Sequence, residues 1–360
     1  MEFIHIADVH LGMAPDAGFP WSEVREKEIW DTFEKVIMEI RRRKTDLLLI
    51  AGDLFHRQPL ARELKEVGYL FEQIPDTRVV LIAGNHDYLK RDSNYLKYKW
   101  PSNVTGLFGA SCQVCYLEDI NTYVYGMSYT GREITEPVYN QNFPGGSRNL
   151  EREHEGANHI LLAHGGDEKH IPIQFRQLGE TDFNYIALGH IHKPQILIEN
   201  KMAYSGSLEP LDKNHTGAHG FIRGTIHNGV TKIQFEPFAS RNYVKLPVQV
   251  TPDTTVLSLR RQITQTLTQT GKNNIYQILL EGQREADTDF LSGHIEDLGN
   301  IVEICDRTEP EYDFMELQKQ YSGTVLGEYI SRFTEGNIPL DPVREKALYL
   351  GVQALLEARQ

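Results

Sequence analysis

The N-terminal half of the chain contains three short runs of apolar residues, and each run ends in polar residues. The runs are EFIHIAD (residues 2–8), DLLLIAGD (46–53) and RVVLIAGNHD (78–87). None of them alternates apolar with polar residues, as a strand with one face in water does. A continuous apolar run predicts a strand that is covered on both faces. The first constraint on the fold is therefore a layered α/β core.

Helices and further strands extend this core. A helix from about Ser22 to Arg43 has Ser22 as its candidate N-cap, and its basic run Arg41–Lys44 suits the negative C-terminal end. Five apolar residues lie on one face of this helix: Ile29, Phe33, Val36, Ile37 and Ile40. We also expect a helix at about Leu60–Gln73, strands at Thr122–Met127, His159–His164 and Tyr185–His190, and a hairpin at Gly220–Phe238 that turns at Asn228-Gly229.

The pattern changes near Ala239–Arg241, which predicts a domain boundary there. A strand, a helix and two further strands follow, at Tyr243–Val250, about 256–270, Ile275–Glu281 and Ile301–Cys305. The chain from about Glu311 is helical, and Asp341-Pro342 opens its last helix. The predicted division is 1–240, then a smaller α/β module at 241–310, then a helical segment at 311–360. We expect the apolar residues of that segment to pack on their own domain, with docking on a partner as the alternative. They are Phe314, Leu317, Val325, Leu326, Tyr329, Ile330, Phe333, Val343, Leu348, Val352, Leu355 and Leu356.

Charge and cysteine content narrow the class of protein. The formal net charge of −13 over 360 residues argues against a surface covered in non-specific nucleic-acid contacts, but permits a local basic groove or a bound metal. Three cysteines do not make a disulfide framework, and the CxxC of Cys112 and Cys115 has no second pair to complete a zinc site. The first strand begins at residue 2, and every apolar run is far shorter than a membrane span, so we expect a cytoplasmic protein.

The polar clusters recur in a fixed order along the chain, each at the end of an expected strand. They read DxH, GDxxH, GNHD, a single histidine and GHxH. Ligand sites of layered α/β folds lie at the carboxyl ends of strands, so these side chains can converge on one site. The residues are Asp8, His10, Asp53, His56, Asn85, His86, Asp87, His164, His190 and His192.

These residue types indicate a metal centre. Alternate residues of an extended segment face one way, so Asp8 and His10 can bind one ion together. Imidazole, carboxylate and amide ligands without thiolate suit manganese, iron or zinc better than an all-oxygen site. The set is large enough for two divalent ions about 3.5–4 Å apart. The alternative is that single histidines are satisfied core or loop residues and that GNHD is only a turn, but the ordered set as a whole argues against it.

The ordered set resembles the calcineurin-like metallophosphoesterase superfamily. Within it, the stretches GDLFHRQ, GHIHKPQ and AYSGSLEP (residues 52–58, 189–195 and 203–210) are similar to the DNA repair exonucleases of the SbcD and YhaO type. The resemblance is strong over about residues 1–240. It implies a layered β-sandwich flanked by helices, a smaller α/β capping domain and a helical C-terminal tail.

The resemblance also implies roles for individual residues. Asp8, His10 and His192 would bind one metal, Asn85, His164 and His190 the other, and Asp53 would bridge them. His86 would be the catalytic histidine, Asp87 would orient its ring, and His56 would be the second active-site histidine of the nuclease branch. The two ions, manganese first with iron, zinc or magnesium as alternatives, would activate a hydroxide that attacks the phosphodiester. The chain departs from the family after His164, where Gly-Gly-Asp-Glu follows.

A basic segment follows GNHD, in which lysine and arginine alternate with aromatic residues. Arg57, Lys90, Arg91, Lys97 and Lys99 are candidate contacts to DNA phosphates, and Tyr88, Tyr95, Tyr98 and Trp100 are candidate stacking residues. The alternatives are a helix that covers the core with its aromatic face, and a dimer interface as in the family. The expected function is a DNA exonuclease or endonuclease in repair, with an SbcC-like coiled-coil ATPase and a second copy as partners and no membrane. A phosphodiesterase or phosphatase for other substrates is the main alternative, and a non-enzymatic scaffold is a third.

Overall fold

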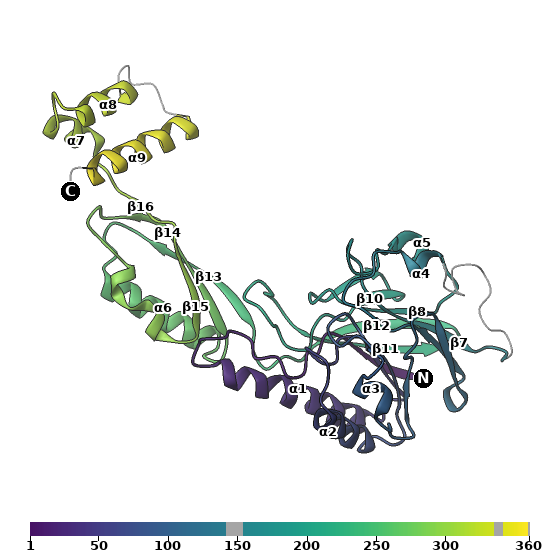
Figure 1. Cartoon of the computed structure of the whole chain (residues 1–360). Helices are drawn as coiled ribbons and strands as arrows, with labels where there is room; N and C mark the ends of the chain where they lie inside the picture. Colours follow the sequence, from purple (N-terminus) through teal and green to yellow (C-terminus); the bar gives the residue numbers. More distant parts are fainter. Residues whose placement is uncertain (142–153, 335–340, 359–360) are drawn as a thin grey trace. The chain divides into compact units, whose positions relative to one another are not determined.

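The computed structural model describes residues 1–141, 154–334 and 341–358. The chain forms two compact units. The first comprises Met1–Lys245 with Thr270–Gln277 and Gly299–Glu303, and the second comprises Leu246–Gln269, Ile278–Leu298 and Ile304–Gln360. Figure 1 labels their helices and strands. Among the described residues, no helix is long and apolar enough to cross a membrane.

Two six-stranded sheets form the first unit. One has the order β12-β11-β1-β2-β3-β4, in which β1 to β4 are parallel, and the other has the order β5-β6-β7-β8-β10-β9. The strands of the first are β1 (Glu2–Ile6), β2 (Leu47–Ala51), β3 (Arg78–Ile82), β4 (Val104–Gly106), β11 (Gly220–His227) and β12 (Val230–Pro237). Those of the second are β5 (Gln113–Leu117), β6 (Thr122–Gly126), β7 (Asn158–His164), β8 (Tyr185–Gly189), β9 (Gln195–Ile198) and β10 (Met202–Tyr204).

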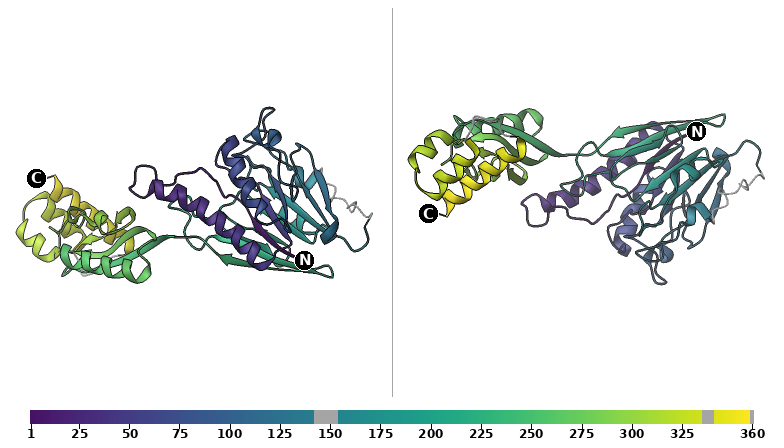
Figure 2. Two further views of the ribbon diagram at one scale, coloured as in Figure 1. Left: turned by 90° about the horizontal axis from the view of Figure 1, so that it is seen from below. Right: turned by 90° about the horizontal axis from the view of Figure 1, so that it is seen from above.

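The first sheet is buried on both faces, as its continuous apolar runs predict. Helices α1 (Ser22–Arg43) and α2 (Ala61–Glu72) cover one face, and the second sheet packs on the other (Figures 1 and 2). Leu48 and Ile50 belong to the helix-side cluster, whereas Leu47, Leu49 and Ala51 belong to the cluster between the sheets. The expected layered α/β architecture is therefore confirmed.

The N-cap of helix α1 lies one residue earlier in the chain than expected. Its N-cap is Trp21, without a side-chain cap, and Ser22 is already the first helical residue, so the prediction of Ser22 as N-cap is wrong. The indole of Trp21 donates instead to Asp16 Oδ2 at 2.8 Å, which fixes the entry of the chain into the helix. The helix ends as expected after three arginines, with Lys44 in the left-handed conformation at φ 56°.

The predicted hairpin forms between β11 and β12, and it turns at the expected residues. Asn228 (φ 50°) and Gly229 (φ 76°) both have positive φ, as a two-residue hairpin turn of this twist requires. The described residues of the first unit also include three short helices: α3 (Asn94–Lys97), α4 (Val138–Gln141) and α5 (Phe175–Gly179).

A third sheet has the order β13-β14-β15, with β16 paired to β14. Its strands are β13 (Tyr243–Val250), β14 (Ile275–Arg284), β15 (Ile301–Asp306) and β16 (Glu309–Pro310), and helix α6 (Val256–Thr270) follows β13. These elements match the strands and the helix that the sequence predicts.

The last three helices are α7 (Phe314–Gln320), α8 (Val325–Thr334) and α9 (Pro342–Glu357). They share a small apolar cluster built around Leu326, Ile330, Leu348 and Val352. The Asp341 side chain accepts hydrogen bonds from two backbone N–H groups at the start of α9, as predicted. Val325 and Val343 do not pack as expected: 73% and 78% of their surfaces are exposed, because both lie in the first turn of a helix, away from the cluster.

Candidate metal centre

The polar clusters gather at the carboxyl ends of five strands. Asp8 and Asp53 follow β1 and β2, Asn85 follows β3, His164 ends β7, and His190 follows β8. Because β1, β2 and β3 are parallel neighbours in one sheet, and β7 and β8 in the other, their ends meet at one edge of the sandwich. The structure thus brings together side chains that lie 182 positions apart in the chain, as the contact between His10 Nε2 and His192 Nε2 shows.

The backbone at this edge has an unusual conformation. Asp8, His10 and Asp53 have positive φ, at 50°, 53° and 50°, and His190 has φ 97°. The prediction that Asp8 and His10 project from an extended segment is therefore wrong, although both reach the site. Backbone bonds hold the turn, with Asp8 N donating to Gly52 O and His10 N to Asp53 O, each at 3.1 Å. Left-handed non-glycine residues cost roughly 1–2 kcal/mol each, and such strain gathers at functional sites.

The first group of donors is Asp8, His10 and His192, whose ligand atoms lie within 4.8 Å of one another. His10 Nε2 and His192 Nε2 face each other at 3.1 Å, and His192 Nε2 lies 3.9 Å from Asp8 Oδ1. Asp8 and His10 are completely buried. Two imidazole nitrogens that point at one spot beside a buried carboxylate are a donor set that suits a divalent cation.

The second group of donors is Asn85, His164 and His190. The Asn85 Oδ1 atom lies 2.9 Å from His164 Nε2 and 3.2 Å from His190 Nδ1. His164 Nδ1 faces the carbonyl of Ala51 at 2.9 Å, so in the neutral ring Nδ1 carries the hydrogen and the lone pair of Nε2 is directed into the site.

Asp53 links the two groups through a single oxygen atom. Its Oδ2 lies 3.8 Å from His10 Nε2 and 3.4 Å from His164 Nε2, and its Oδ1 accepts the backbone N–H of His86 at 2.9 Å. One carboxylate between two donor groups is the arrangement that a two-ion site needs. The residues present therefore fit a pair of divalent cations.

The electrostatics of the site favour neutral imidazole ligands. Burial lowers the pKa of His10 well below its ordinary value, that of His192 to about 3 and that of His190 to about 4. His164 is the exception, since burial opposes protonation but the adjacent Asp53 carboxylate raises its pKa to about 9. Neutral imidazole is the form that binds a metal, so most of the set is ready to do so at neutral pH.

His56 and His86 lie beside the donor groups and are more accessible. Their rings stack at 5.1 Å between centroids, and His86 Nδ1 faces the carbonyl of His56 at 3.2 Å. His56 Nδ1 lies 3.3 Å from His10 Nδ1. His86 is exposed and His56 half-buried, so both rings can reach a bound substrate.

Asp87 does not orient the His86 ring as expected, because its carboxylate binds elsewhere. It accepts the backbone N–H groups of Phe55 (3.1 Å) and Gly84 (2.7 Å) and the hydroxyl of Tyr95 (2.6 Å). Asp87 thus ties together the two turns that carry the histidines, and the His56 carbonyl is the group that faces the His86 ring.

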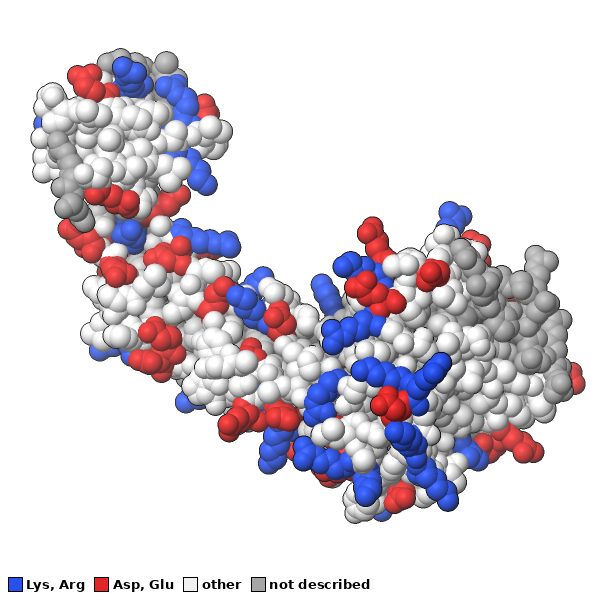
Figure 3. Space-filling model, viewed as in Figure 1, with Lys and Arg blue, Asp and Glu red and all other residues white. Residues whose placement is uncertain are grey.

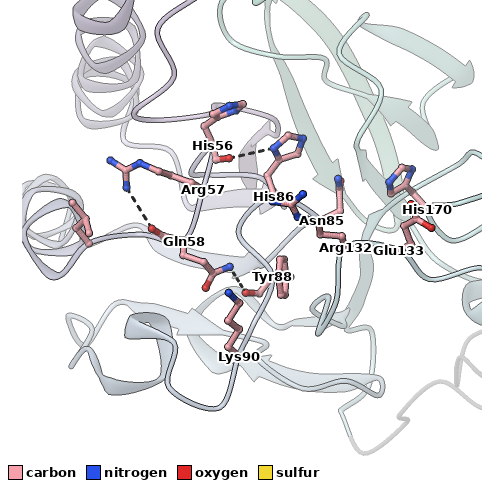
Figure 4. Close-up of a pocket in the computed structure, with 11 residues that line it drawn as sticks. His56, Arg57, Gln58, Asn85, His86, Tyr88, Lys90, Arg132, Glu133 and His170 are labelled. Atoms are coloured by element: carbon pink, nitrogen blue, oxygen red, sulfur yellow. Dashed lines mark hydrogen bonds between the residues drawn. The ribbon is translucent and has the colours of Figure 1, made fainter.

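A cleft of about 720 Å³ opens in front of His56 and His86. Figure 4 shows Arg57 on one side and Arg132 and His170 on the other, with His86 and Asn85 between them. Figure 3 shows lysine and arginine side chains gathered over the region of α2 and α3 in the first unit. The cleft is lined by His56, Arg57, Gln58, Leu60, Asn85, His86, Tyr88, Lys90, Arg132, Glu133 and His170.

Of the predicted phosphate contacts, Arg57 and Lys90 line this cleft, whereas Arg91, Lys97 and Lys99 are exposed outside its lining. Arg57 also forms a two-pronged ion pair with Glu63, at 2.7 and 3.1 Å. Sequence reasoning missed Arg132, because it lies far from every motif.

The aromatic residues of the basic segment divide between two roles. Tyr95, Tyr98 and Trp100 pack against the core cluster under α1 and α2, so the core-covering alternative holds for these three. Tyr88 lines the cleft, and the Lys90 ammonium lies 5.3 Å from the centre of its ring.

Asp167 is a second residue that sequence reasoning missed, and it lies in the Gly-Gly-Asp-Glu stretch that follows His164. Its Oδ2 is 2.7 Å from His190 Nε2, and His170 also contacts it. Burial opposes ionisation of Asp167, but its hydrogen bonds with these two histidines hold its pKa below the ordinary range. The GGDE stretch was the available signal, since it places a carboxylate three residues after His164.

The cysteines take no part in this centre. Cys112 and Cys115 are free thiols, and no metal-capable group among the described residues includes either of them. Burial raises the pKa of Cys112 to about 12 and that of Cys115 to about 11, so both remain protonated.

Fold and site together define a class of protein, and comparison with known families agrees. The calcineurin-like phosphoesterase family matches residues 1–194. The chain therefore belongs to the calcineurin-like phosphoesterases, a family of metal-dependent hydrolases, and the resemblance read from its motifs is confirmed.

Relatives within this family place the chain more narrowly. It is similar to the DNA double-strand break repair protein Mre11 of Methanocaldococcus jannaschii, with 30% identity over 231 residues, 59% of this chain and 58% of that protein. The uncharacterized metallophosphoesterase YhaO of Bacillus subtilis is 26% identical over 295 residues, 76% of this chain and 69% of that protein. The Mre11 protein of Methanococcus maripaludis is 26% identical over 262 residues, 66% and 67% of the two chains. The match thus spans less than two thirds of the Methanocaldococcus protein.

Proposed function

We propose that this protein is a two-metal phosphodiesterase that cuts DNA, as an exonuclease and endonuclease in repair. The observation that carries the proposal is the position of His56 and His86, which lie between two linked donor groups and a cleft that presents Arg57, Lys90 and Arg132. The similarity to Mre11 proteins, whose name assigns them to double-strand break repair, supports the choice of DNA.

The two donor groups would hold the metal ions. Asp8, His10 and His192 suit one ion, and Asn85, His164 and His190 suit the other, with Asp53 between them. Two divalent ions there would neutralise phosphate oxygens and lower the pKa of a water between them. Manganese fits the mixture of imidazole, carboxylate and amide oxygen, with iron, zinc and magnesium as alternatives.

His86 and His56 would manage the proton of the leaving group. A carbonyl oxygen only accepts, so His86 Nδ1 carries a hydrogen that points at His56 O and leaves Nε2 free for the substrate. In its protonated form the ring would donate from Nε2 to the departing 3′-oxygen, with His56 stacked beside it. The product would then carry a free 3′-hydroxyl, with the phosphate on the 5′ side.

The cleft supports a polymeric substrate. A small phosphodiester needs only the metal centre and the two histidines, whereas cations on both walls suit the phosphates that flank the scissile bond. The net charge of −13 restricts such contacts to this region of the surface.

The remaining parts of the proposal concern domains and partners. Residues 1–240 would form the nuclease domain, 241–310 a capping domain, and 311–360 a helical segment that docks on an SbcC-like coiled-coil ATPase. A homodimer in the cytoplasm is the proposed state. The family match over residues 1–194 and the similarity to Mre11 and YhaO support the first of these assignments, the nuclease domain, whereas the others rest on the resemblance of the motifs.

One assay tests the proposed activity. Purified protein with Mn²⁺ is given labelled duplex and single-stranded DNA, and separately bis-p-nitrophenyl phosphate, with His86→Ala and chelator as controls. We expect cleavage of both substrates, lost in both controls. Cleavage of the small diester alone, even after the ATPase partner is added, would favour a phosphodiesterase for small molecules. Cleavage of neither would refute the enzyme.

A further inference from the structure

The loop after β7 holds a carboxylate against the outer edge of a proposed metal ligand. Asp167 Oδ2 lies 2.7 Å from His190 Nε2. The other oxygen, Oδ1, accepts the backbone N–H groups of Lys169 (2.8 Å) and His170 (2.9 Å), and the His170 ring lies 2.9 Å away. Oδ1 is thus fixed by backbone groups of the loop itself, and Oδ2, which also lies 2.9 Å from His170 Nδ1, is directed at His190.

The loop that carries Asp167 is hydrogen-bonded through its backbone to a neighbouring segment of the chain. The backbone at Asp167 is therefore held in a fixed position. Ile134 N donates to Lys169 O at 2.9 Å, and Ile171 N donates to Ile134 O at 2.7 Å. Gly166 N closes the loop on His170 O at 2.8 Å. These bonds connect the loop to the segment that presents Arg132 to the cleft.

A carboxylate only accepts hydrogen bonds, so its contact decides which nitrogen of His190 carries the hydrogen. With Nε2–H donating to Asp167, the lone pair stays on Nδ1. That atom faces Asn85 Oδ1 at 3.2 Å, within the second donor group. A carboxylate behind a ligating imidazole fixes both the ring orientation and the tautomer, and strengthens the imidazole as a ligand.

We propose that Asp167, with His170 beside it, is the positioning residue of the second ion site and acts through His190. The proposal rests on the proposed two-metal function and adds to it a residue outside all the motifs. The first ion site uses His10 and His192 instead, whose Nε2 atoms face each other. Loss of Asp167 is therefore expected to weaken one ion and to leave the other unchanged.

The first test needs no metal. The 14 histidines are labelled with ¹⁵N, and the His190 signals are assigned by their absence in His190→Gln, in chelator at pH 8. In the wild-type chain we expect one tautomer with Nε2 protonated, and in Asp167→Ala a mixture of both tautomers. Glu168→Ala is the matched control, because it removes an exposed carboxylate from the same loop. Identical His190 signals in Asp167→Ala and the wild type would overturn the proposal.

The second test measures metal affinity. Calorimetric titration of the metal-free chain with Mn²⁺ should show two ions, one of which binds about 10–100-fold more weakly in Asp167→Ala. Asp167→Asn should recover part of the loss, since its amide oxygen still accepts from Nε2–H. Equal weakening of both ions, or of neither, would refute the positioning role. If the wild-type chain binds fewer than two ions, the proposed two-metal function fails, and the tautomer measurement still decides what Asp167 does.

Discussion

At the scale of single residues, the contacts of individual oxygen and nitrogen atoms define the geometry of this site. Asp53 Oδ2 faces one histidine from each donor group, while the neighbouring Oδ1 takes the backbone N–H that begins the His86 turn. Asp167 and the carbonyl of His56 each face one nitrogen of an imidazole, at His190 and His86 respectively. The motif residues are the candidate ligands, and their orientation in the proposed site would depend on such neighbouring groups.

Arg132 gives a prediction at this scale. It lines the cleft and makes no ion pair among the described residues, so its charge is available to a phosphate. We expect Arg132→Ala to raise the KM for DNA several-fold and to reduce the slope of log affinity against log salt by about 1. Cleavage of bis-p-nitrophenyl phosphate should not change.

The matched control for this prediction is Arg176→Ala, which removes an arginine with a 96% exposed side chain from α5, paired with Glu180 alone in the described part of the chain. Kinetics at several salt concentrations would check both variants. An unchanged salt slope in Arg132→Ala would show that this arginine does not contact the DNA backbone.

At the scale of elements, the geometry of the site depends on where the strands end more than on how long they are. The turn after β2 passes so close to β7 that a Cβ at Gly52 would lie 2.3 Å from His164 Nδ1. Gly52 also has φ +90°, a conformation that other residues adopt only with strain. This glycine lets two strands from different sheets bring their ligands together.

We therefore expect Gly52→Ala to displace His164 and abolish binding of the second ion, measured by Mn²⁺ titration. Gly18→Ala is the control, because Gly18 has a similar φ of +94° with nothing within 4 Å of the added Cβ. Both variants should lose stability, by about 1 kcal/mol from backbone strain, but only Gly52→Ala should lose the ion. Full two-ion binding by Gly52→Ala would refute this role.

The stretch AYSGSLEP, one of the motifs on which the family resemblance rests, has a structural role in this fold. The buried Glu209 carboxylate accepts from Thr32 Oγ1 and from the backbone N–H of Ser240, both at 2.6 Å, and pairs with Arg25 at 3.3 Å. It fixes helix α1 and the chain beyond β12 to the loop after β10.

At the scale of the whole molecule, the stability of the fold depends on a histidine that takes no part in the site. His5 lies in β1 and is completely buried, with Nδ1 2.9 Å from the Tyr185 hydroxyl and Nε2 without a partner among the described residues. Burial lowers its pKa to about 3. The folded chain therefore holds this imidazole neutral at pH values where the unfolded chain protonates it.

Because the unfolded state binds the extra proton, the free energy of unfolding falls as pH drops below about 6.5, towards 3. The contribution of one such group is roughly 1.4 kcal/mol per pH unit. We expect His5→Gln, in which the amide still meets Tyr185, to show a correspondingly shallower decline between pH 6 and 4.5. Urea unfolding of both proteins in chelator would measure it, and parallel pH profiles would contradict the assignment.

Many elements of the fold and the candidate donors of the site can be predicted from the sequence alone. The apolar runs define strands buried on both faces, because a side chain that never meets water needs no polar alternation. Asn228-Gly229 predicts its hairpin, and Asp341 its cap, because these signals act within a few residues. The ordered motifs likewise predict the candidate donors of the metal centre, because each motif lies at the end of its own strand.

What the sequence could not supply depends on distance through space. The left-handed turns at Asp8 and His10, the redirected carboxylate of Asp87, and the placement of Arg132 and Asp167 beside the site follow from contacts between separate segments of the chain. Local propensity carries no information on contacts between residues far apart in the chain. Those contacts are determined by packing and hydrogen bonding in the folded structure. The sequence by itself determined the fold class and the set of candidate donors; only the tertiary structure decided which groups contact those donors, because such contacts depend on neighbours that the chain brings in from elsewhere.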